Sequence, residues 1–429
     1  MGKHAMRVAM AAIAVGTAMA AAPAFAQDTG LSAGNTAWML TASASVLMMT
    51  IPGVALFYGG MVRKKNVLST VMHSFATTCL ITVIWMVIGY SLAFTEGTSF
   101  IGGLGMIFLG GLTPEAMRGS IPETVFMIFQ MSFAIITAAL ITGAVAERMK
   151  FSALLLFLGL WSVLVYSPVA YWVWGGGFLG DAGVLDFAGG TVVHVNSGVA
   201  ALVAAIMLGK RIGYGTENLA PHNVVLTLTG AALLWIGWFG FNAGSANAAD
   251  GTAGMALVVT QIAPASAALA WMFAEWITHG KPSVLGIASG AISGLAAVTP
   301  ASGFVGPGGA LAIGLISGVI CFWGASWLKR AFGYDDCLDV FAIHGLGGIT
   351  GAVLTGVFAV EAIGGTPGAI EGNVEQIATQ LLGVLVTIVY CASVTFVLLR
   401  LIELAMGIRV EAQQEYEGLD IALHGESVT

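Results

Sequence analysis

The chain has 429 residues, of which 58% are hydrophobic and only 9% are charged, against about 25% charged residues in an ordinary soluble domain. A single water-facing core cannot hide that much apolar surface, so the surface itself must face lipid. The net charge of −7 lies in loops and in the C-terminal tail, no basic stripe is present, and a nucleic-acid partner is therefore excluded.

The first predicted element is a cleavable signal peptide over residues 1–26. Lys3 and Arg7 give it a positive start, an Ala-rich apolar run follows, and Ala24-Phe25-Ala26 supplies the small-x-small cleavage pattern. A short first membrane helix is the alternative. Cleavage after Ala26 would leave a mature chain that begins at Gln27 outside the cytoplasm.

Eleven apolar runs follow, each long enough to cross a hydrocarbon core of ~30 Å. They predict transmembrane helices over residues 36–58, 67–94, 123–146, 151–173, 191–209, 223–243, 252–276, 283–300, 305–327, 339–360 and 376–405. The sequence therefore predicts an all-α membrane protein with a transmembrane domain over 27–408 and a polar tail over 409–429.

The loops between these runs indicate the orientation of the bundle. Twelve of the 15 Lys and Arg residues follow odd-numbered helices: Arg63, Lys64, Lys65, Arg148, Lys150, Lys210, Arg211, Lys281, Lys329, Arg330, Arg400 and Arg409. Only Arg118 lies in a loop after an even-numbered helix. The positive-inside rule then places the N-terminus outside and the C-terminus in the cytoplasm of a cell whose inner membrane holds the protein.

The eleven helices also carry a weak internal repeat. Helices one to five and six to ten form two halves, inverted because five is odd, and helix eleven stands outside the repeat. The last helix of each half opens with an acidic residue and then a histidine. These are Asp186 with His194, and Asp339 with His344.

His194 and His344 are the histidines that lie deep within predicted membrane helices near the midplane. Two facing neutral imidazoles would offer hydrogen-bond donors and acceptors to a neutral solute and no counter-charge to a cation. Two independent histidines that tie helices together would give the same sequence, and the residues alone do not separate these alternatives.

Aromatic residues mark two further segments near the outer ends of helices. Trp174, before three glycines, is either an interfacial tryptophan or a cation–π platform for an ammonium-like ion. Ser245 could accept a hydrogen bond from a cation, and Phe241 could be a hydrophobic gate. Phe129 and Phe133 share one helix face at i, i+4, a spacing more typical of core packing.

Asp186 precedes a predicted helix N-terminus. Its position favours a capping and scaffold role over a ligand role. An electrostatic contribution to an entering cation stays open. No metal-ligand spacing appears among the histidines, the acidic residues and the four cysteines, so no metal or cofactor is expected.

Several strings of this sequence resemble the Amt/Mep/Rh ammonium transporter family, and its bacterial Amt branch in particular. They are Tyr90-Ser-Leu-Ala-Phe94, Trp174-Gly-Gly-Gly, Leu185-Asp-Phe-Ala-Gly-Gly-Thr-Val-Val-His194, Ile236-Gly-Trp-Phe-Gly-Phe-Asn-Ala-Gly-Ser245 and Asp339-Val-Phe-Ala-Ile-His344-Gly. The similarity runs in unbroken order from about residue 36 to residue 425.

The resemblance implies a role for each of these residues. Phe133, Trp174 and Ser245 would form an outer ammonium site, with Gln130 and Phe129 nearby, and Phe133 with Phe241 would be the gate below it. His194 and His344 would be paired pore histidines, and Asp186 would organise the vestibule. It also implies one pore per subunit, a homotrimer in membrane lipid, and a cytoplasmic PII-type signalling protein that docks at the tail.

The function expected from these features is ammonium transport and not enzymatic catalysis. Ammonium would lose a proton at the outer site, and ammonia would pass the pore with or without separate proton transfer, because a bare cation costs several kcal/mol in an apolar lumen. An ammonium sensor and a general gas channel are the rivals. An intramembrane enzyme would need a nucleophile–base pair or metal ligands in the bundle, and none appears at the required spacing.

Overall fold

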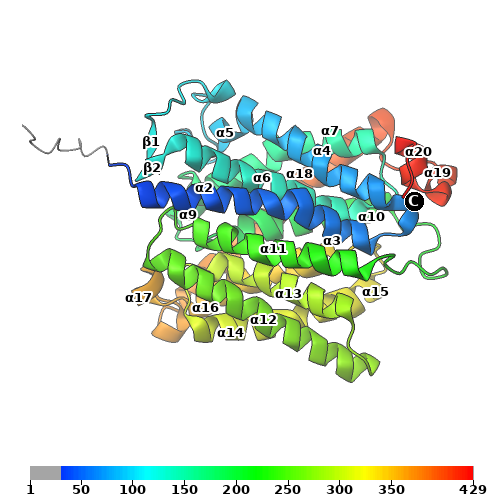
Figure 1. Ribbon diagram of the computed structural model, residues 1–429. Coiled ribbons are helices and arrows are strands. Elements are labelled where there is room, and N and C mark those ends of the chain that lie inside the picture. The colour runs from blue at the N-terminus through cyan, green and yellow to red at the C-terminus, as the bar shows by residue number, and fades with distance from the viewer. Residues whose placement is uncertain (1–29, 429) are drawn as a thin grey trace, which may run out of the picture.

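The structure is a computed structural model, and it describes residues 30–428. The predicted signal peptide and its cleavage site lie outside the described residues. Within these, eleven helices are long and apolar enough to cross a bilayer, which confirms the predicted number, and they run side by side in one bundle (Figure 1). Their bounds are Ala33–Met61, Lys64–Phe94, Glu123–Val145, Phe151–Asp181, Gly190–Leu208, Val224–Gly244, Gly251–His279, Val284–Ala301, Pro307–Phe332, Phe341–Phe358 and Glu375–Met406.

Many of these spans combine an α-helix with a short π-helical turn. The α-helices are α2 (Ala33–Met48), α3 (Ala55–Met61), α4 (Val67–Ile84), α5 (Tyr90–Phe94), α6 (Glu123–Val145), α7 (Phe151–Trp161), α8 (Ser167–Trp174), α9 (Phe178–Asp181), α10 (Asn196–Leu208), α11 (Val224–Gly244), α12 (Gly251–His279), α13 (Val284–Val298), α14 (Pro307–Trp323), α15 (Lys329–Phe332), α16 (Leu346–Phe358) and α18 (Glu375–Met406). The π-helical turns are Met49–Val54, Trp85–Gly89, Ser162–Tyr166, Gly190–Val195, Gly324–Leu328 and Phe341–Gly345.

Short elements connect and extend the spans. They are the hairpin of β1 (Met117–Arg118) and β2 (Ile121–Pro122), the 3₁₀ turns Lys64–Asn66, Ile107–Leu109, Thr299–Ala301 and Ala369–Glu371, and the helices α17 (Glu361–Gly364), α19 (Ala412–Glu417) and α20 (Leu419–His424). Helices dominate because lipid offers the backbone no hydrogen bonds, so each spanning segment must satisfy its own N–H and C=O groups.

Burial separates the inner spans from those that face outward. In α6, 89% of the most apolar stretch is buried inside the protein, whereas the corresponding share is 28% for the span Lys64–Phe94. A helix that is apolar on all sides and buried on all sides lies in the middle of a bundle. The side chains of α6 therefore pack against several neighbours at once, and α6 is the helix around which the candidate site is built.

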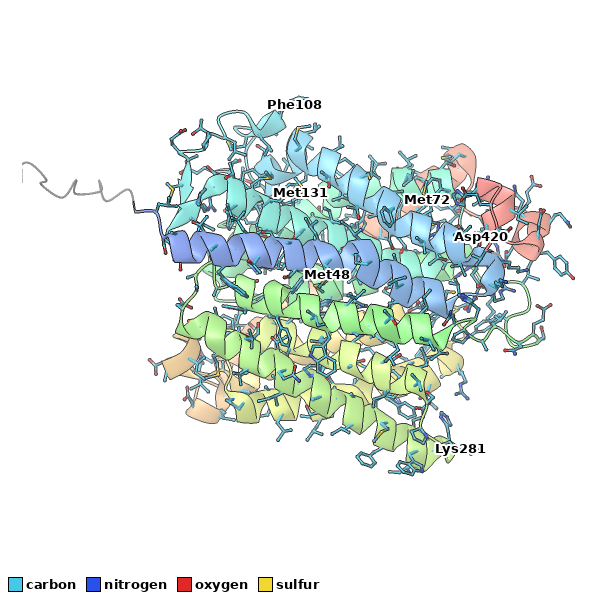
Figure 2. All side chains as sticks on the ribbon, in the orientation of Figure 1. Met48, Met72, Phe108, Met131, Lys281 and Asp420 are labelled. Carbon is cyan, nitrogen blue, oxygen red and sulfur yellow. The ribbon has the colours of Figure 1, made fainter. Side chains whose placement is uncertain are left out.

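The cations gather at one end of the bundle, which we call the cation-rich end. It is the end at which α3, α12 and α15 finish and at which α19 and α20 lie; Figure 2 shows Lys281 and Asp420 there. The C-terminal tail packs against the loops of this end. The N–H of Val410 donates to the carbonyl of Arg148 (3.0 Å), and the N–H of Leu419 donates to Oδ1 of Asn66 (2.8 Å).

Buried ion pairs join four loops at the cation-rich end. Glu147 accepts from Arg63 (2.8 Å) and from Arg211 (3.2 Å), and Arg211 also forks onto both carboxylate oxygens of Asp335 (2.8 and 2.9 Å). Burial by itself would raise the pKa of Glu147, but Arg211 and Arg63 outweigh it and hold that pKa below its ordinary value. These four side chains come from the loops after spans one, three, five and nine, so the network fixes those loops to one another.

Candidate functional site: an aromatic cavity above a histidine pair

A cavity of about 340 Å³ lies where α6, α8 and α11 meet, at the end of the bundle opposite the C-terminus. It is lined by Phe94, Phe126, Gln130, Phe133, Val173, Trp174, Phe187, Ser245 and Asn247. The three residues predicted as an outer ammonium site, Phe133, Trp174 and Ser245, all line it. The ring of Phe133 meets the ring of Trp174 edge-on, at a centroid distance of 5.8 Å and an angle of 84°.

Hydrogen bonds fix the polar groups of this cavity. Trp174 Nε1 donates to the carbonyl of Asp186 (2.8 Å), which locks the indole, and Ser245 Oγ donates to the carbonyl of Phe241 (2.9 Å). The proton of Ser245 is thereby engaged, and its oxygen keeps lone pairs for a donor in the cavity. Gln130 Oε1 is buried and has no hydrogen-bond partner within residues 30–428. The cavity therefore offers oxygen acceptors and ring faces, and no carboxylate lines it.

Two phenylalanine rings close the inner side of this cavity. Phe133 and Phe241 are both buried and stack at a centroid distance of 4.1 Å with an angle of 19° between the rings. Phe129, one turn before Phe133 on α6, supports that ring at 4.9 Å. On the inner side of Phe241 lie Trp238 and His194, with ring centroids 5.6 Å and 6.1 Å from the centroid of Phe241. The stacked rings separate the cavity from the histidines.

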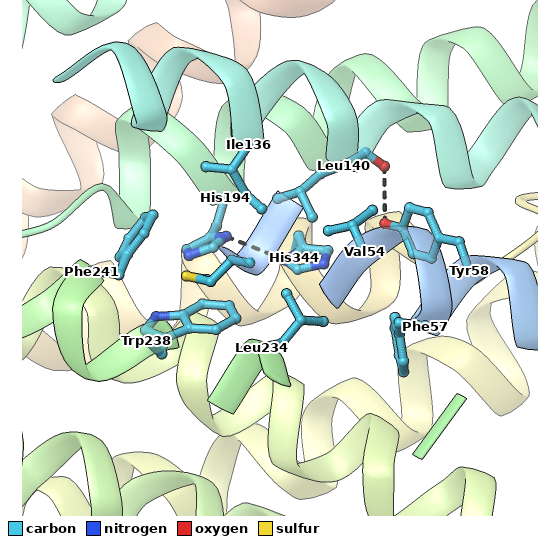
Figure 3. Close-up of a pocket in the computed structure, with 11 residues that line it drawn as sticks. Val54, Phe57, Tyr58, Ile136, Leu140, His194, Leu234, Trp238, Phe241 and His344 are labelled. Carbon is cyan, nitrogen blue, oxygen red and sulfur yellow. Dashed lines mark hydrogen bonds between the residues drawn. The ribbon is translucent and has the colours of Figure 1, made fainter. Parts of the chain in front are cut away.

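His194 and His344 meet in the middle of the bundle. Their Nδ1 atoms are 3.2 Å apart, so one ring donates to the other, and the rings are nearly parallel at a centroid distance of 5.3 Å. Figure 3 shows the pair among the residues that line a small cavity. The volume of this cavity is about 10 Å³, close to the least space that holds one water molecule. Apart from the histidines and the Tyr58 hydroxyl, the cavity is walled by apolar side chains: Met49, Val54, Phe57, Ile136, Leu140, Leu234, Trp238 and Phe241.

Two glycines set the distance between the histidines. Gly198, four residues after His194, packs so closely that a Cβ there would lie 2.3 Å from the N atom of Gly345. Gly348, four residues after His344, would place a Cβ 2.9 Å from Cβ of His194. Small residues at such crossings let membrane helices approach backbone to backbone. Each histidine thus lies where the glycine of the opposite helix permits the approach.

Carboxylates cap the helix start before each histidine. Asp186 accepts from four backbone N–H groups: Gly189 (2.8 Å) and Gly190 (2.6 Å) bond Oδ1, and Thr191 (2.8 Å) and Val192 (3.1 Å) bond Oδ2. Four N–H groups are the number left unsatisfied at a helix start. Asp186 is therefore a buried cap, and it is not among the residues that line the outer cavity.

In the second half of the chain, the capping acid is Asp336. The sequence analysis predicted Asp339 as the counterpart of Asp186, and that prediction is wrong. Asp336 Oδ2 accepts from the N–H of Phe341 (2.7 Å), and burial raises the pKa of Asp336 to about 6. Asp339 instead accepts a hydrogen bond from Nζ of Lys329 (2.8 Å). The spacing could have revealed this, because Asp336 precedes His344 by the same eight residues that separate Asp186 from His194.

Trp238 is a site residue that the sequence reasoning did not single out. Its indole stacks on His194 at 5.3 Å with an angle of 23°, and its Nε1 donates to the hydroxyl of Thr299 (2.9 Å). The signal was present, because Trp238 precedes Phe241 by three residues and so shares its helix face.

No group of His, Cys, Asp and Glu able to hold a metal ion occurs among the described residues.

Comparisons with known proteins give the family. The Ammonium Transporter Family matches residues 37–429. An ammonium transporter of Bacillus subtilis is 49% identical over 92% of this chain and 98% of its own, and the ammonium transporter Amt1 of Archaeoglobus fulgidus is 46% identical over 92% and 99%. The crystal structure of Saccharomyces cerevisiae Mep2 superposes with a TM-score of 0.85 at 35% identity, over 90% of this chain and 89% of that one.

These matches settle three of the predictions made from the sequence. The resemblance to the Amt branch and the multi-pass membrane fold are confirmed, and the relatives are named as transporters and not as enzymes. The chain belongs to the ammonium transporter family.

Proposed function

We propose that this protein recruits ammonium in the aromatic cavity, removes a proton from it, and conducts ammonia past the stacked phenylalanines along the histidine pair. The observation that carries the proposal is the order of these three features. An acceptor-lined aromatic cavity, an apolar pair of rings and two hydrogen-bonded imidazoles follow one another, each in contact with the next.

The recruitment step rests on Trp174, Phe133 and Ser245. Ring faces attract a cation by about 0.5–2 kcal/mol, and the free lone pairs of Ser245 accept a hydrogen bond from an N–H donor. A sodium ion holds its water more tightly and gains less from ring faces. A potassium ion is similar in size to ammonium but has no proton to donate. Ser245 therefore favours ammonium, because only ammonium can direct an N–H group at the serine oxygen.

The deprotonation step follows from the wall of the inner cavity. Among its described lining residues are eight apolar side chains and no carboxylate, and a charge without a partner costs several kcal/mol at this depth. Ammonia is neutral and can donate to one imidazole nitrogen and accept from another. The proton left behind either stays on the outer side or crosses the membrane separately.

The orientation and assembly of the protein are further parts of this proposal. The cation-rich end would face the cytoplasm of a cell with an inner membrane, the mature N-terminus would lie outside after signal-peptide cleavage, and residues 409–429 would form a cytoplasmic tail. The resemblance adds a homotrimer in membrane lipid and a PII-type protein at the tail. Chemical crosslinking of the purified protein and pull-down with a PII-type protein test the last two.

The test is a current measurement on purified protein in liposomes on a solid support, with pulses of ammonium, potassium and carbon dioxide. We expect a saturable ammonium current and none with potassium. Ser245→Ala should lower the preference of ammonium over potassium, and His194→Ala combined with His344→Ala should abolish selective conduction. If no current appears, a liposome pH assay distinguishes neutral ammonia conduction from gas passage.

Unchanged ammonium-over-potassium selectivity in the double histidine variant would refute the role assigned to the pair. Unchanged selectivity in Ser245→Ala would refute recruitment by the serine hydroxyl while it leaves the histidine role standing. Phe75→Ala is a matched control, because that aromatic side chain is 49% exposed on α4 and lines neither cavity.

A further inference from the structure

A third cavity, of about 430 Å³, lies between the ends of α12 and α14 at the cation-rich end, and it shares no lining residue with the other two. It is lined by Thr278, His279, Phe322, Ser326, Trp327, Arg330 and Ala331. Helices α12 and α14 pack along their lengths, so the cavity is a notch where the two helices finish. The rings of His279 and Phe322 pack edge to face at a centroid distance of 5.9 Å, and both line the cavity.

Arg330 distinguishes this notch from the rest of the cation-rich end. Four other arginines there each hold a carboxylate: Arg63 with Glu147, Arg211 with Asp335, Arg400 with Glu403 and Arg409 with Glu415. Arg330 is exposed, and its side chain makes no ion pair or hydrogen bond with any residue from 30 to 428. Lys281 follows His279 by two residues at the end of α12 (Figure 2), and it adds a second cation close to the notch.

Glu275, which lies four residues before His279 on α12, already has hydrogen-bond partners. Glu275 accepts from the N–H of Ser283 (2.9 Å) and from its hydroxyl (2.8 Å), and it does not line the notch. Glu275 carries one negative charge, and Lys281 and Arg330 carry one positive charge each, so the charge around the notch is positive. An anion that entered the notch would meet a free guanidinium without displacing an existing partner, and this guanidinium can bond two phosphate oxygens at once.

Aromatic side chains show at which depth the notch lies. Trp323 and Trp327 stack at 5.2 Å and are 44% and 55% exposed, and on α12 the exposed rings of Phe273 and Trp276 stack on each other. Exposed tryptophans on apolar helices mark the level of the lipid headgroups. Below this level α12 and α14 present exposed apolar side chains, such as Leu269 and Val319, which acyl chains can cover.

From these contacts we propose that the notch binds the phosphate of an anionic phospholipid. Arg330 forks onto two phosphate oxygens, a ring nitrogen of His279 donates to a third, and the acyl chains lie along α12 and α14. The hydroxyls of Ser326 and Thr278 donate to backbone carbonyls one turn earlier. Their oxygens therefore accept and do not donate, which leaves Arg330 as the main anchor.

The test is native mass spectrometry of the full purified chain with added dioleoyl-phosphatidic acid or dioleoyl-phosphatidylcholine. We expect tighter binding of the phosphatidic acid, and we expect Arg330→Gln to weaken it about five-fold, since one basic residue at a membrane surface contributes about 1 kcal/mol. Arg400→Gln is the matched control: it removes an exposed arginine at the same end that lies outside the notch.

Three outcomes would overturn the proposal. The first is equal binding of the two lipids, or equal binding by Arg330→Gln and the unsubstituted protein. The second is competition by inorganic phosphate at the lipid concentration, which would identify a site for a free anion. The third is a disulfide between two copies of Ser326→Cys in membranes, which would place a second copy of this chain in the notch. Arg330 makes no contact whose loss would unfold the protein, so the variant remains informative.

Discussion

Gly198→Ala tests how the fold brings the two histidines together. A Cβ at residue 198 would lie 2.3 Å from the N atom and 2.4 Å from the Cα atom of Gly345. Carbon atoms pack at about 3.5–4.0 Å, so α10 and the π-helical turn Phe341–Gly345 must separate by about 1 Å. The Nδ1–Nδ1 contact of 3.2 Å then exceeds hydrogen-bond range.

The size of the effect follows from that lost contact. A buried hydrogen bond contributes about 1 kcal/mol. Because about 1.4 kcal/mol corresponds to a ten-fold change in rate, we expect ammonium conduction to fall roughly five-fold. Overpacking should also lower the free energy of unfolding by about 1–3 kcal/mol. The assay is the liposome current, with the melting temperature measured on the same preparation.

The control for this substitution is Gly254→Ala on α12, where a new Cβ meets no atom within 4 Å. It should conduct like the unsubstituted protein. Gly348→Ala is the counterpart in the other half, because its Cβ would approach the carbonyl oxygen of Gly190 to 2.7 Å. If Gly198→Ala folds and conducts at the original rate, the close crossing is not what holds the histidine pair.

Two further substitutions test the buried charges. Asp186→Asn keeps one acceptor oxygen and turns an amide N–H₂ toward two of the four N–H groups that Asp186 caps. We expect the free energy of unfolding to fall by about 3 kcal/mol. An unchanged melting temperature in detergent would contradict the capping role. Glu147→Gln leaves Arg63 without its carboxylate and should cost about 3 kcal/mol. Because the folded-state pKa of Glu147 is depressed, its stabilisation is present above its unfolded pKa and is lost as the pH falls through the folded pKa. The glutamine variant should therefore show a weaker acid dependence of melting, and an acid dependence equal to that of the original chain would refute this.

The spans and the aromatic cluster follow from local pattern. The lengths of the apolar runs predicted the ends of the eleven helices to within a few residues. The exceptions are the fourth and ninth spans, which continue through the turns Phe178–Asp181 and Lys329–Phe332. The i, i+4 spacing of Phe129 and Phe133 placed both rings on one helix face, and the rings touch. Such features depend on one helix at a time, so hydrophobicity and helical period suffice to predict them.

The meeting of His194 and His344 could not be predicted from residue patterns in the same way. It depends on the crossing of two spans 150 residues apart, and the crossing depends on Gly198 and Gly348, whose role is visible only once both backbones are in place. The resemblance supplied the pairing, and the contacts supply its physical cause. Asp336 was overlooked because Asp339 stands nearer to the histidine, although the eight-residue spacing pointed to Asp336.

The hydrogen bonds of the tail have a consequence for biosynthesis. The hydrogen-bond partners of Lys150 and Asn66 are Ile408 and Leu419, which are synthesised after all eleven spans. Chains emerge N-terminus first, at about 5–20 residues per second, so the early loops wait through most of translation with these groups exposed to water. These contacts of the cation-rich end therefore form only after the eleven spans are made, and a ribosome that stops before residue 408 releases a bundle whose early loops lack these partners.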